Sequence, residues 1–212
     1  NLAWRQTANA ASWAFRCAMP REAEMTVLPA DVTVLFVPGL RDHVDEHWQT
    51  HAARAIPGSV TVEPLTLDRL SRAARVAALD AALNSIEGDV VIAAHSAGCL
   101  MVAHWAENPT RAIKAALLAT PADVENPLPT GYPTPDALNE GGWVPMARSK
   151  MPFPTLVVAS QNDPLARFDR VADLAESWGA TLHDGGEVGH LNPPAGFGPW
   201  PKGLELIAQL AK

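Results

Sequence analysis

Residues 89–98 read Asp-Val-Val-Ile-Ala-Ala-His-Ser-Ala-Gly. The β-branched and small apolar residues at 89–94 predict a strand buried on both faces, and the apolar run at 99–107 predicts a helix. Ser96 lies on the tight turn between them, with its hydroxyl above the sheet and the next backbone N–H at a helix N-terminus, whose dipole favours negative charge. The stretch therefore predicts a nucleophile elbow of the G-x-S-x-G type, with Ala94 in place of the first glycine.

Strand-like and helix-like runs alternate along the rest of the chain from residue 31 onward, which is typical of a parallel sheet with helices on both faces. Further strands are predicted at 32–37, 59–63, 112–119, 154–160 and 180–184. Further helices are predicted at 45–56, 68–86 with Asp68 as N-cap, 168–178 and 204–210. Together with the elbow, this order predicts an α/β-hydrolase fold, a compact and mostly parallel sheet flanked by helices, with a minimal lid.

Two segments stand apart from this alternation. Residues 121–152 are rich in proline and glycine and show little periodicity, which predicts a lid-like loop rather than a simple connector. Residues 1–24 contain arginines but no acid before Glu22, and are predicted as an N-terminal extension to which the sequence assigns no role; a targeting segment fits this composition, and so does extra sequence that precedes a natural start at Met25. Residues 25–212 are expected to form a single domain, with a lid too short to build a large cap.

Two further residues have the placement that a serine nucleophile requires. Asp163 follows the strand predicted at 154–160. His190 follows the short strand predicted at 180–184. Both would lie at the carboxyl edge of the sheet, and the chain order Ser, Asp, His is that of α/β-hydrolases, with His190 as general base and Asp163 orienting it. The simpler alternatives are a helix cap for Ser96, a turn former for Asp163 and a loop histidine for His190.

An oxyanion hole and a substrate pocket are expected next to these residues. The N–H of Ala97 is the first predicted oxyanion donor, and the N–H of Leu40, in the loop after the strand at 32–37, is the second. The residues expected to contact substrate are His95, Trp48, Trp143 and Asn192. For the tryptophans, a place in the hydrophobic core is the alternative.

Composition argues against several other classes of protein. The formal net charge is −7 without any cluster of Lys and Arg, so nucleic acid is not an expected partner. No apolar run approaches the roughly 20 residues that cross a bilayer, so no membrane span is expected. Cys17 and Cys99 lack disulfide or metal spacing, which favours a reducing, cytoplasmic location, and Cys99 is expected in the core. His43, His47 and His51 repeat every four residues without an H-E-x-x-H pattern, so neither a metal nor an organic cofactor is expected.

Several motifs give the chain a resemblance to a known family. They are Val37-Pro38-Gly39 with His47-Trp48-Gln49, the elbow itself, residues 153–160 running into Asn162-Asp163-Pro164, Gly189-His190-Leu191-Asn192, and the Gly- and Trp-Pro-containing block 196–203. On these motifs the chain, from Val32 to its C-terminus, resembles the retinoblastoma-binding protein 9 and YdeN-like serine hydrolase family. The resemblance implies a compact sheet with a minimal lid, and it places the nucleophile at Ser96, the acid at Asp163 and the base at His190. Pro193-Pro194 departs from the smaller residues usual there, which bears on the pocket beside His190.

The expected function is that of a serine hydrolase working through an acyl-enzyme intermediate, most simply a carboxylesterase for small or short-chain acyl substrates. Amidase, thioesterase and peptidase activities use the same side chains and stay open. The alternative is a protein-binding module that keeps the hydrolase fold with weak or no activity. The interaction history of the family and the proline-rich segment 121–152 favour that alternative, and the intact Ser, His and Asp argue against it.

Overall fold

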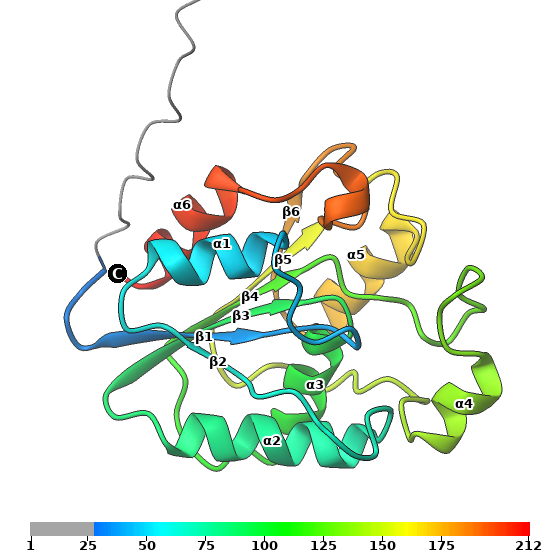
Figure 1. Ribbon diagram of the computed structural model, residues 1–212, viewed down its shortest axis with the longest axis horizontal. Coiled ribbons are helices and arrows are strands. Elements are labelled where there is room, and N and C mark those ends of the chain that lie inside the picture. The colour runs from blue at the N-terminus through cyan, green and yellow to red at the C-terminus, as the bar shows by residue number, and fades with distance from the viewer. Residues whose placement is uncertain (1–27) are drawn as a thin grey trace, which may run out of the picture.

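The computed structural model describes residues 28–212, in which a sheet of six strands forms the centre of the molecule (Figure 1). The strands are β1 (Val32–Val37), β2 (Val60–Thr61), β3 (Asp89–His95), β4 (Ala115–Ala119), β5 (Thr155–Ala159) and β6 (Thr181–Asp184). Their spatial order is β2-β1-β3-β4-β5-β6, and every neighbouring pair is parallel. The predicted extension at 1–24 lies outside the described residues.

Helices cover both faces of the sheet, as the alternating pattern predicts (Figure 1). α1 (Trp48–Ala55) and α6 (Pro201–Leu210) pack on one face with Phe36, Leu117 and Val158. α2 (Arg72–Asn84), α3 (Ala97–Trp105) and α5 (Phe168–Ser177) pack on the other face. Because both faces are covered, the central strands are buried along their length and read as continuous apolar runs rather than alternating ones.

The strand order places a crevice where the site is expected. The chain leaves β1 toward β2 at one edge, and then returns to build β3, β4, β5 and β6 on the other side of β1. The connections after β1 and β3 therefore diverge, and in open parallel sheets ligands bind at such a switch point, outside the carboxyl ends of the strands. The side-chain amide of Gln49 joins the ends of β1 and β3 at this point, because it donates to the carbonyls of Val37 (3.2 Å) and Ala93 (2.9 Å).

The predicted elements are present, with differences at their ends that have local causes. The helix predicted from residue 68 begins at Arg72, and its N-cap is Ser71, whose hydroxyl accepts from the N–H of Ala74 (3.2 Å). The prediction of Asp68 as N-cap is wrong: Asp68 has a φ of +48°, and its carbonyl instead accepts from the N–H of Ser71 (2.7 Å) in a turn before the helix. α6 begins three residues earlier than predicted, at Pro201, because proline is favoured in the first turn of a helix.

The segment 121–152, predicted as a lid-like loop, leaves the carboxyl end of β4 and returns to β5. It contains one short helix, α4 (Pro135–Glu140), whose N-cap Thr134 accepts from the N–H of Ala137 (3.3 Å). A helix of six residues is too short to show a 3.6-residue period, which is why the sequence pattern does not reveal it. None of the helices described in residues 28–212 has the length and apolarity needed to cross a membrane.

Candidate active site

The turn after β3 holds Ser96 in a backbone conformation that few residues adopt. Ser96 has φ +57° and ψ −127°, and it is the residue immediately before α3. Its N–H donates to the carbonyl of Ala119 at the end of β4 (3.0 Å), and its carbonyl accepts from the N–H of Cys99 (3.0 Å). Positive φ in a residue other than glycine is strained, and such strain persists where the surrounding structure over-determines the conformation. The geometry is that of the predicted nucleophile elbow.

Small residues are required around this turn because backbones come close together. A Cβ atom on Gly98 would lie 2.3 Å from the carbonyl oxygen of Val37 and 2.7 Å from that of Pro38, distances at which a side chain cannot be accommodated. On Gly39, a Cβ would lie 3.1 Å from the Cβ of Ser96. Ala94, which replaces the first glycine of the motif, has no exposed surface and fits within β3. The elbow is thus fixed by steric contacts with the loop after β1.

Ser96, His190 and Asp163 come from three separate loops and form a continuous hydrogen-bonded chain. The Oγ of Ser96 is 2.8 Å from Nε2 of His190, and Nδ1 of His190 is 2.8 and 3.0 Å from the two carboxylate oxygens of Asp163. The carboxylate can only accept, so Nδ1 carries the proton and Nε2 is left free to accept from the serine hydroxyl. The side chains of Asp163 and His190 are 2% and 4% exposed, which keeps this hydrogen-bonded chain largely out of water.

Neighbouring backbone groups hold the acid and the base in place. The N–H of Leu165 donates to Oδ1 of Asp163 (2.8 Å), so the carboxylate is fixed by its own loop. The N–H of Gly189 donates to Oδ1 of Asn162 (2.6 Å), which joins the loop of the acid to the loop of the base. Gly189 needs its positive φ of +56° at this point. Asn162 lies in the Asn162-Asp163-Pro164 motif, but sequence reasoning assigns it no role.

Three imidazole rings, tilted by 60° and 55° from one to the next, pack in a row next to the serine, and we call this row the imidazole stack. His95 lies between the other two, with ring centroids 4.4 Å from His47 and 4.8 Å from His190. Nε2 of His95 donates to the carbonyl of His190 (2.8 Å), and Nδ1 of His47 accepts from the N–H of Gln49 (3.2 Å) as the cap of α1. The carbonyl fixes the tautomer of His95, and the amide donor fixes that of His47. His95 thereby holds the backbone of the residue that contacts the serine.

His47 and His95 are kept neutral by their surroundings. Burial, and then the repulsion from charge on His190, lowers the pKa of His47 to about 4. Burial lowers the pKa of His95 well below its ordinary value, with smaller contributions from His190 and His47. A positive charge on either ring would lie against His190 and oppose its protonation. Near neutral pH, the stack therefore supports His190 by packing and by one hydrogen bond, without adding charge.

The two predicted oxyanion donors border the same space as the serine. Ala97 is the first residue of α3, and Leu40 lies in the loop after β1. Within residues 28–212, neither N–H has a hydrogen-bond acceptor. The buried Arg75 of α2 holds the loop after β1, because it donates to the carbonyl of Leu40 (3.2 Å) and to the carboxylate of Asp42 (2.9 Å). Sequence reasoning misses Arg75, although its position four residues before Leu79 on the buried face of α2 is a usable signal for a buried charge with a partner.

A cavity of about 590 Å³ opens above Ser96, which is within the usual size range for small-molecule sites. His95 and Asn192, predicted to contact substrate, both border it, as do Pro193 and Pro194. The segment 121–152 supplies one wall through its residues Ala122, Val124, Leu128, Gly131, Tyr132 and Pro133.

The two tryptophans predicted to contact substrate do not border the cavity. Trp48 is 1% exposed and packs edge-on against Trp200 in the core beneath α1. Trp143 has no exposed surface, and its indole N–H donates to the carbonyl of Leu70 (2.7 Å). Placing them in the pocket is therefore a wrong prediction for this structure. The large apolar area of the two rings is buried in the core instead.

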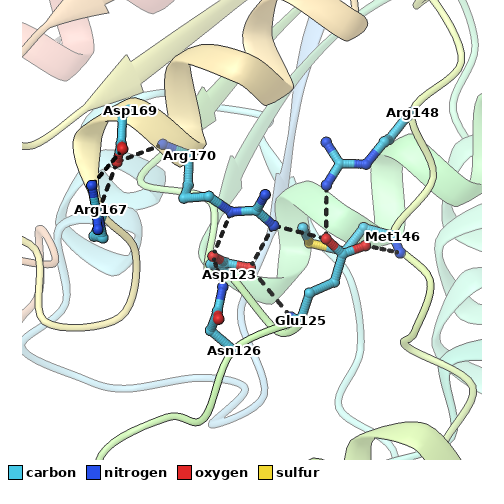
Figure 2. Close-up of polar contacts among 8 residues, drawn as sticks. All are labelled: Asp123, Glu125, Asn126, Met146, Arg148, Arg167, Asp169 and Arg170. Carbon is cyan, nitrogen blue, oxygen red and sulfur yellow. Dashed lines mark hydrogen bonds and ion pairs between the residues drawn. The ribbon is translucent and has the colours of Figure 1, made fainter.

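Ion pairs hold the start of the segment 121–152 (Figure 2), in addition to the burial of Ala122 and Val124 in the hydrophobic core. Arg170 of α5 donates to Asp123 (2.9 Å) and to Glu125 (2.8 Å), and Arg148 donates to Glu125 from the other side (2.7 Å). Burial alone would raise the pKa of the Asp123 carboxyl, but hydrogen bonds from Arg170 and Asn126 outweigh it and the pKa is lowered. The N–H of Asp123 also donates to the carbonyl of Leu165 (3.0 Å), so the network borders the loop of Asp163.

The other candidate side chains of the sequence have separate local partners. Nε2 of His43 contacts Asp45 (3.1 Å), and Nε2 of His51 lies 3.7 Å from Glu46, while His47 belongs to the imidazole stack. No group of three or more His, Cys, Asp and Glu side chains in residues 28–212 is placed to hold a metal. The thiol of Cys99 is fully buried in the core, and burial raises its pKa well above the ordinary value.

Comparisons with known proteins identify a matching family and similar solved structures. The sequence model of the serine hydrolase family matches residues 34–209. A YdeN-like hydrolase from Pectobacterium atrosepticum shares 34% identity with a TM-score of 0.68, over 85% of this chain and 91% of that one. The ydeN gene product of Bacillus subtilis shares 19% identity with a TM-score of 0.66, over 84% of this chain and 97% of that one. Mouse alpha/beta hydrolase domain-containing protein 10 shares 13% identity with a TM-score of 0.60, over 84% of this chain and 86% of that one. No curated protein matches the chain. The parallel sheet and these neighbours confirm the predicted α/β-hydrolase fold.

Proposed function

Because this chain belongs to the serine hydrolase family and is similar to its YdeN-like members, we propose that it hydrolyses carboxylic esters of small or short-chain acyl groups, with Ser96, His190 and Asp163 as its catalytic triad. The observation that carries the proposal is the hydrogen-bonded chain from the serine hydroxyl to the imidazole (2.8 Å) and on to the carboxylate (2.8 Å). A group of this kind, at the floor of a cavity, is what acyl transfer requires.

In the proposed reaction, Oγ of Ser96 attacks the acyl carbonyl carbon while Nε2 of His190 takes the hydroxyl proton. The carbonyl oxygen becomes an oxyanion that accepts hydrogen bonds from the N–H groups of Leu40 and Ala97. The C–O bond to the alcohol then breaks, and His190 returns the proton to the leaving oxygen. Water attacks the acyl-enzyme by the same path, releasing the acid and restoring the serine. Asp163 remains ionised and stabilises the imidazolium ion that forms twice in each cycle.

Each part of the surrounding structure has a function in this scheme. The strained elbow presents Oγ to the cavity, and the start of α3 provides an N–H group where the helix dipole favours an anion. His95 and Asn162 fix the backbone on either side of the base. The cavity is large enough to hold both the acyl and the alcohol part of a small ester.

The test is hydrolysis of 4-nitrophenyl acetate and butyrate together with labelling by a fluorophosphonate probe. We expect labelling at Ser96, and a loss of kcat by about 10⁴-fold or more in Ser96→Ala with an unchanged melting temperature. Ser149→Ala is the matched control, because Ser149 is exposed and lies outside the cavity. Wild-type protein that neither turns over these esters nor reacts with the probe would contradict the proposal and leave the protein-binding module as the better hypothesis.

A further inference from the structure

The charges around the catalytic cavity differ from those of the chain as a whole. The chain has a formal net charge of −7, but Arg41 and Arg69 both border the cavity. Asp42 is the one carboxylate among the cavity-lining residues of the described chain, and it is already bound to Arg69 (2.8 Å) and to the buried Arg75 (2.9 Å). The cavity of an acidic protein therefore has a cationic side, and a field of this kind favours anionic ligands.

Arg41 is the cation that is free to bind such a ligand. Within residues 28–212 its guanidinium makes no ion pair and no side-chain hydrogen bond, whereas Arg69 is occupied by Asp42. The guanidinium carbon of Arg41 lies 5.0 Å from the centroid of the Tyr132 ring. An arginine held over an aromatic face keeps its planar edge of N–H donors available, and that edge matches a carboxylate in a two-point hydrogen bond. Tyr132 thus orients Arg41 at the mouth of the cavity.

Apart from its charged residues, the lining of the cavity is mostly apolar. Leu128 and Val124 come from the segment 121–152, Leu165 from the loop of Asp163, and Leu40 from the loop after β1. Arg41 directly follows Leu40, so the cation lies on the same loop as one of the two proposed oxyanion donors. A ligand that fills this space would place its ester at Ser96, an apolar portion along the walls, and an anionic end at Arg41.

We propose that the preferred substrates are esters that carry a carboxylate separated from the scissile ester by an apolar portion, and that Arg41 is the residue that recognises this carboxylate. The inference rests on the proposed function and narrows its substrate class. The carboxylate can belong to the acyl part or to the alcohol part, since both occupy the one cavity. In either case the apolar lining selects the body of the substrate, and the guanidinium selects its charged end.

Matched pairs of substrates, each a carboxylate and its methyl ester, test the proposal, and the change of their ratio in a variant cancels the intrinsic difference in reactivity within a pair. For the acyl side, the pair is the 4-nitrophenyl monoester of suberic acid and its methyl ester at the far carboxyl group. For the alcohol side, the pair is 4-acetoxybenzoate and methyl 4-acetoxybenzoate. Shorter dicarboxylic half-esters are avoided because their own carboxylate attacks the ester at high effective concentration. The readout is the ratio of kcat/KM for the charged substrate to kcat/KM for its neutral partner, which cancels any general change in the catalytic machinery.

In one of the two pairs, we expect the wild-type ratio to exceed about 10, and Arg41→Gln to lower that ratio by about tenfold, mainly through KM for the charged substrate. The preference should weaken when salt is raised from about 0.02 M to about 0.5 M, because the guanidinium is exposed. Arg54→Gln is the matched control: it removes the same charge from an exposed position on α1 that does not border the cavity, and it should leave the ratio unchanged.

The possible outcomes separate this inference from the proposed function. If neutral esters are hydrolysed with Ser96 intact, but both ratios are near 1 or do not change in Arg41→Gln, the carboxylate preference is wrong and the hydrolase proposal holds. If Arg41→Gln lowers kcat/KM equally for charged and neutral substrates, Arg41 acts only by holding Tyr132 and the inference is wrong. If no ester of either kind is hydrolysed and no probe binds, both proposals are wrong.

Discussion

The elbow at the end of β3 and the segment 121–152 both border the catalytic cavity, but different interactions hold them in place. The elbow is fixed by close backbone contacts and by the packing of the neutral rings of His47 and His95 beside His190. The start of the segment 121–152 is held by Asp123 and Glu125, which share the guanidinium of Arg170. The part of the site that would perform the chemistry is therefore fixed by close packing, whereas the part that would contact the substrate depends on ion pairs as well as on packing, so salt and pH should affect it more.

Replacement of a glycine in each region should give the largest contrast. Gly98→Ala would place a Cβ atom 2.3 Å from the backbone oxygen of Val37, where no side chain can move away, so we expect a loss of about 3 kcal/mol or more in the free energy of unfolding. Gly131→Ala meets no atom within 4 Å and incurs only the strain of its positive φ of +94°, about 1 kcal/mol. Urea unfolding of the two variants measures both values. Equal losses of stability would show that the elbow is no more tightly constrained than the segment 121–152.

The two regions should also lose stability in different ranges of pH. The pKa of His47 is lowered to about 4, so below its ordinary value of 6.5 the unfolded chain takes up a proton that the folded chain does not. Stability from this group is complete above pH 6.5 and declines as the pH falls toward about 4, by up to about 3 kcal/mol. The lowered pKa values of Asp123 and Glu125 stabilise the fold above their ordinary values, and that stability is lost only in more acidic solution, as the pH falls through the lowered values.

His47→Asn separates these two ranges. Asparagine can still cap α1 but does not titrate, so the variant should show a shallower fall in the free energy of unfolding between pH 6.5 and 4, whatever its stability at neutral pH. The more acidic range, which reports on the carboxylates, should be unchanged. The measurement is urea unfolding at a series of pH values. Parallel curves for the variant and the wild type between pH 6.5 and 4 would show that His47 does not stay neutral in the folded state.

The elbow side of the site could be predicted from the sequence because its requirements are local. A buried strand, a serine between small residues and a helix are adjacent in the chain, so residues 89–98 are enough to locate Ser96 and the N–H of Ala97. Asp163 and His190 follow predicted strands, and parallel strands bring their carboxyl ends to one edge. The structure brings all three side chains together, and their catalytic role remains a proposal.

What could not be predicted depends on contacts between residues far apart in the chain. Arg75 contacts Asp42, 33 positions away, and Arg170 contacts Asp123, 47 positions away, with no pattern that pairs either acid with its base. Tryptophan is common both in ligand pockets and in hydrophobic cores, and the sequence does not show that the side chains of Trp48 and Trp143 are buried in the core. The contacts among the three imidazole rings could not be predicted from the sequence either, because His47, His95 and His190 belong to three different loops or strand ends.

The ion pairs at the start of the segment 121–152 allow two arginine substitutions to be compared, and the expected effects on stability are the smallest of those considered. Arg170→Gln leaves Asp123, whose side chain is 5% exposed, without its main partner, so we expect a loss of about 2 kcal/mol in the free energy of unfolding. Arg148→Gln removes the same charge from the outer side of Glu125 and should change the free energy of unfolding by about 0.5 kcal/mol or less, since that pair is partly in solvent. Urea unfolding measures both.

The kinetic consequence of Arg170→Gln follows from where the network lies. Asp123 and Glu125 belong to the segment that forms a wall of the cavity, whereas His190 and Ser96 are held by the elbow, His95 and Asn162. The variant should therefore raise KM for the neutral 4-nitrophenyl butyrate while changing kcat by about twofold or less. A large fall in kcat with unchanged KM would mean that the ion pairs act on the triad through the contact between Asp123 and Leu165. The elbow and the segment 121–152 would then not be held independently of each other.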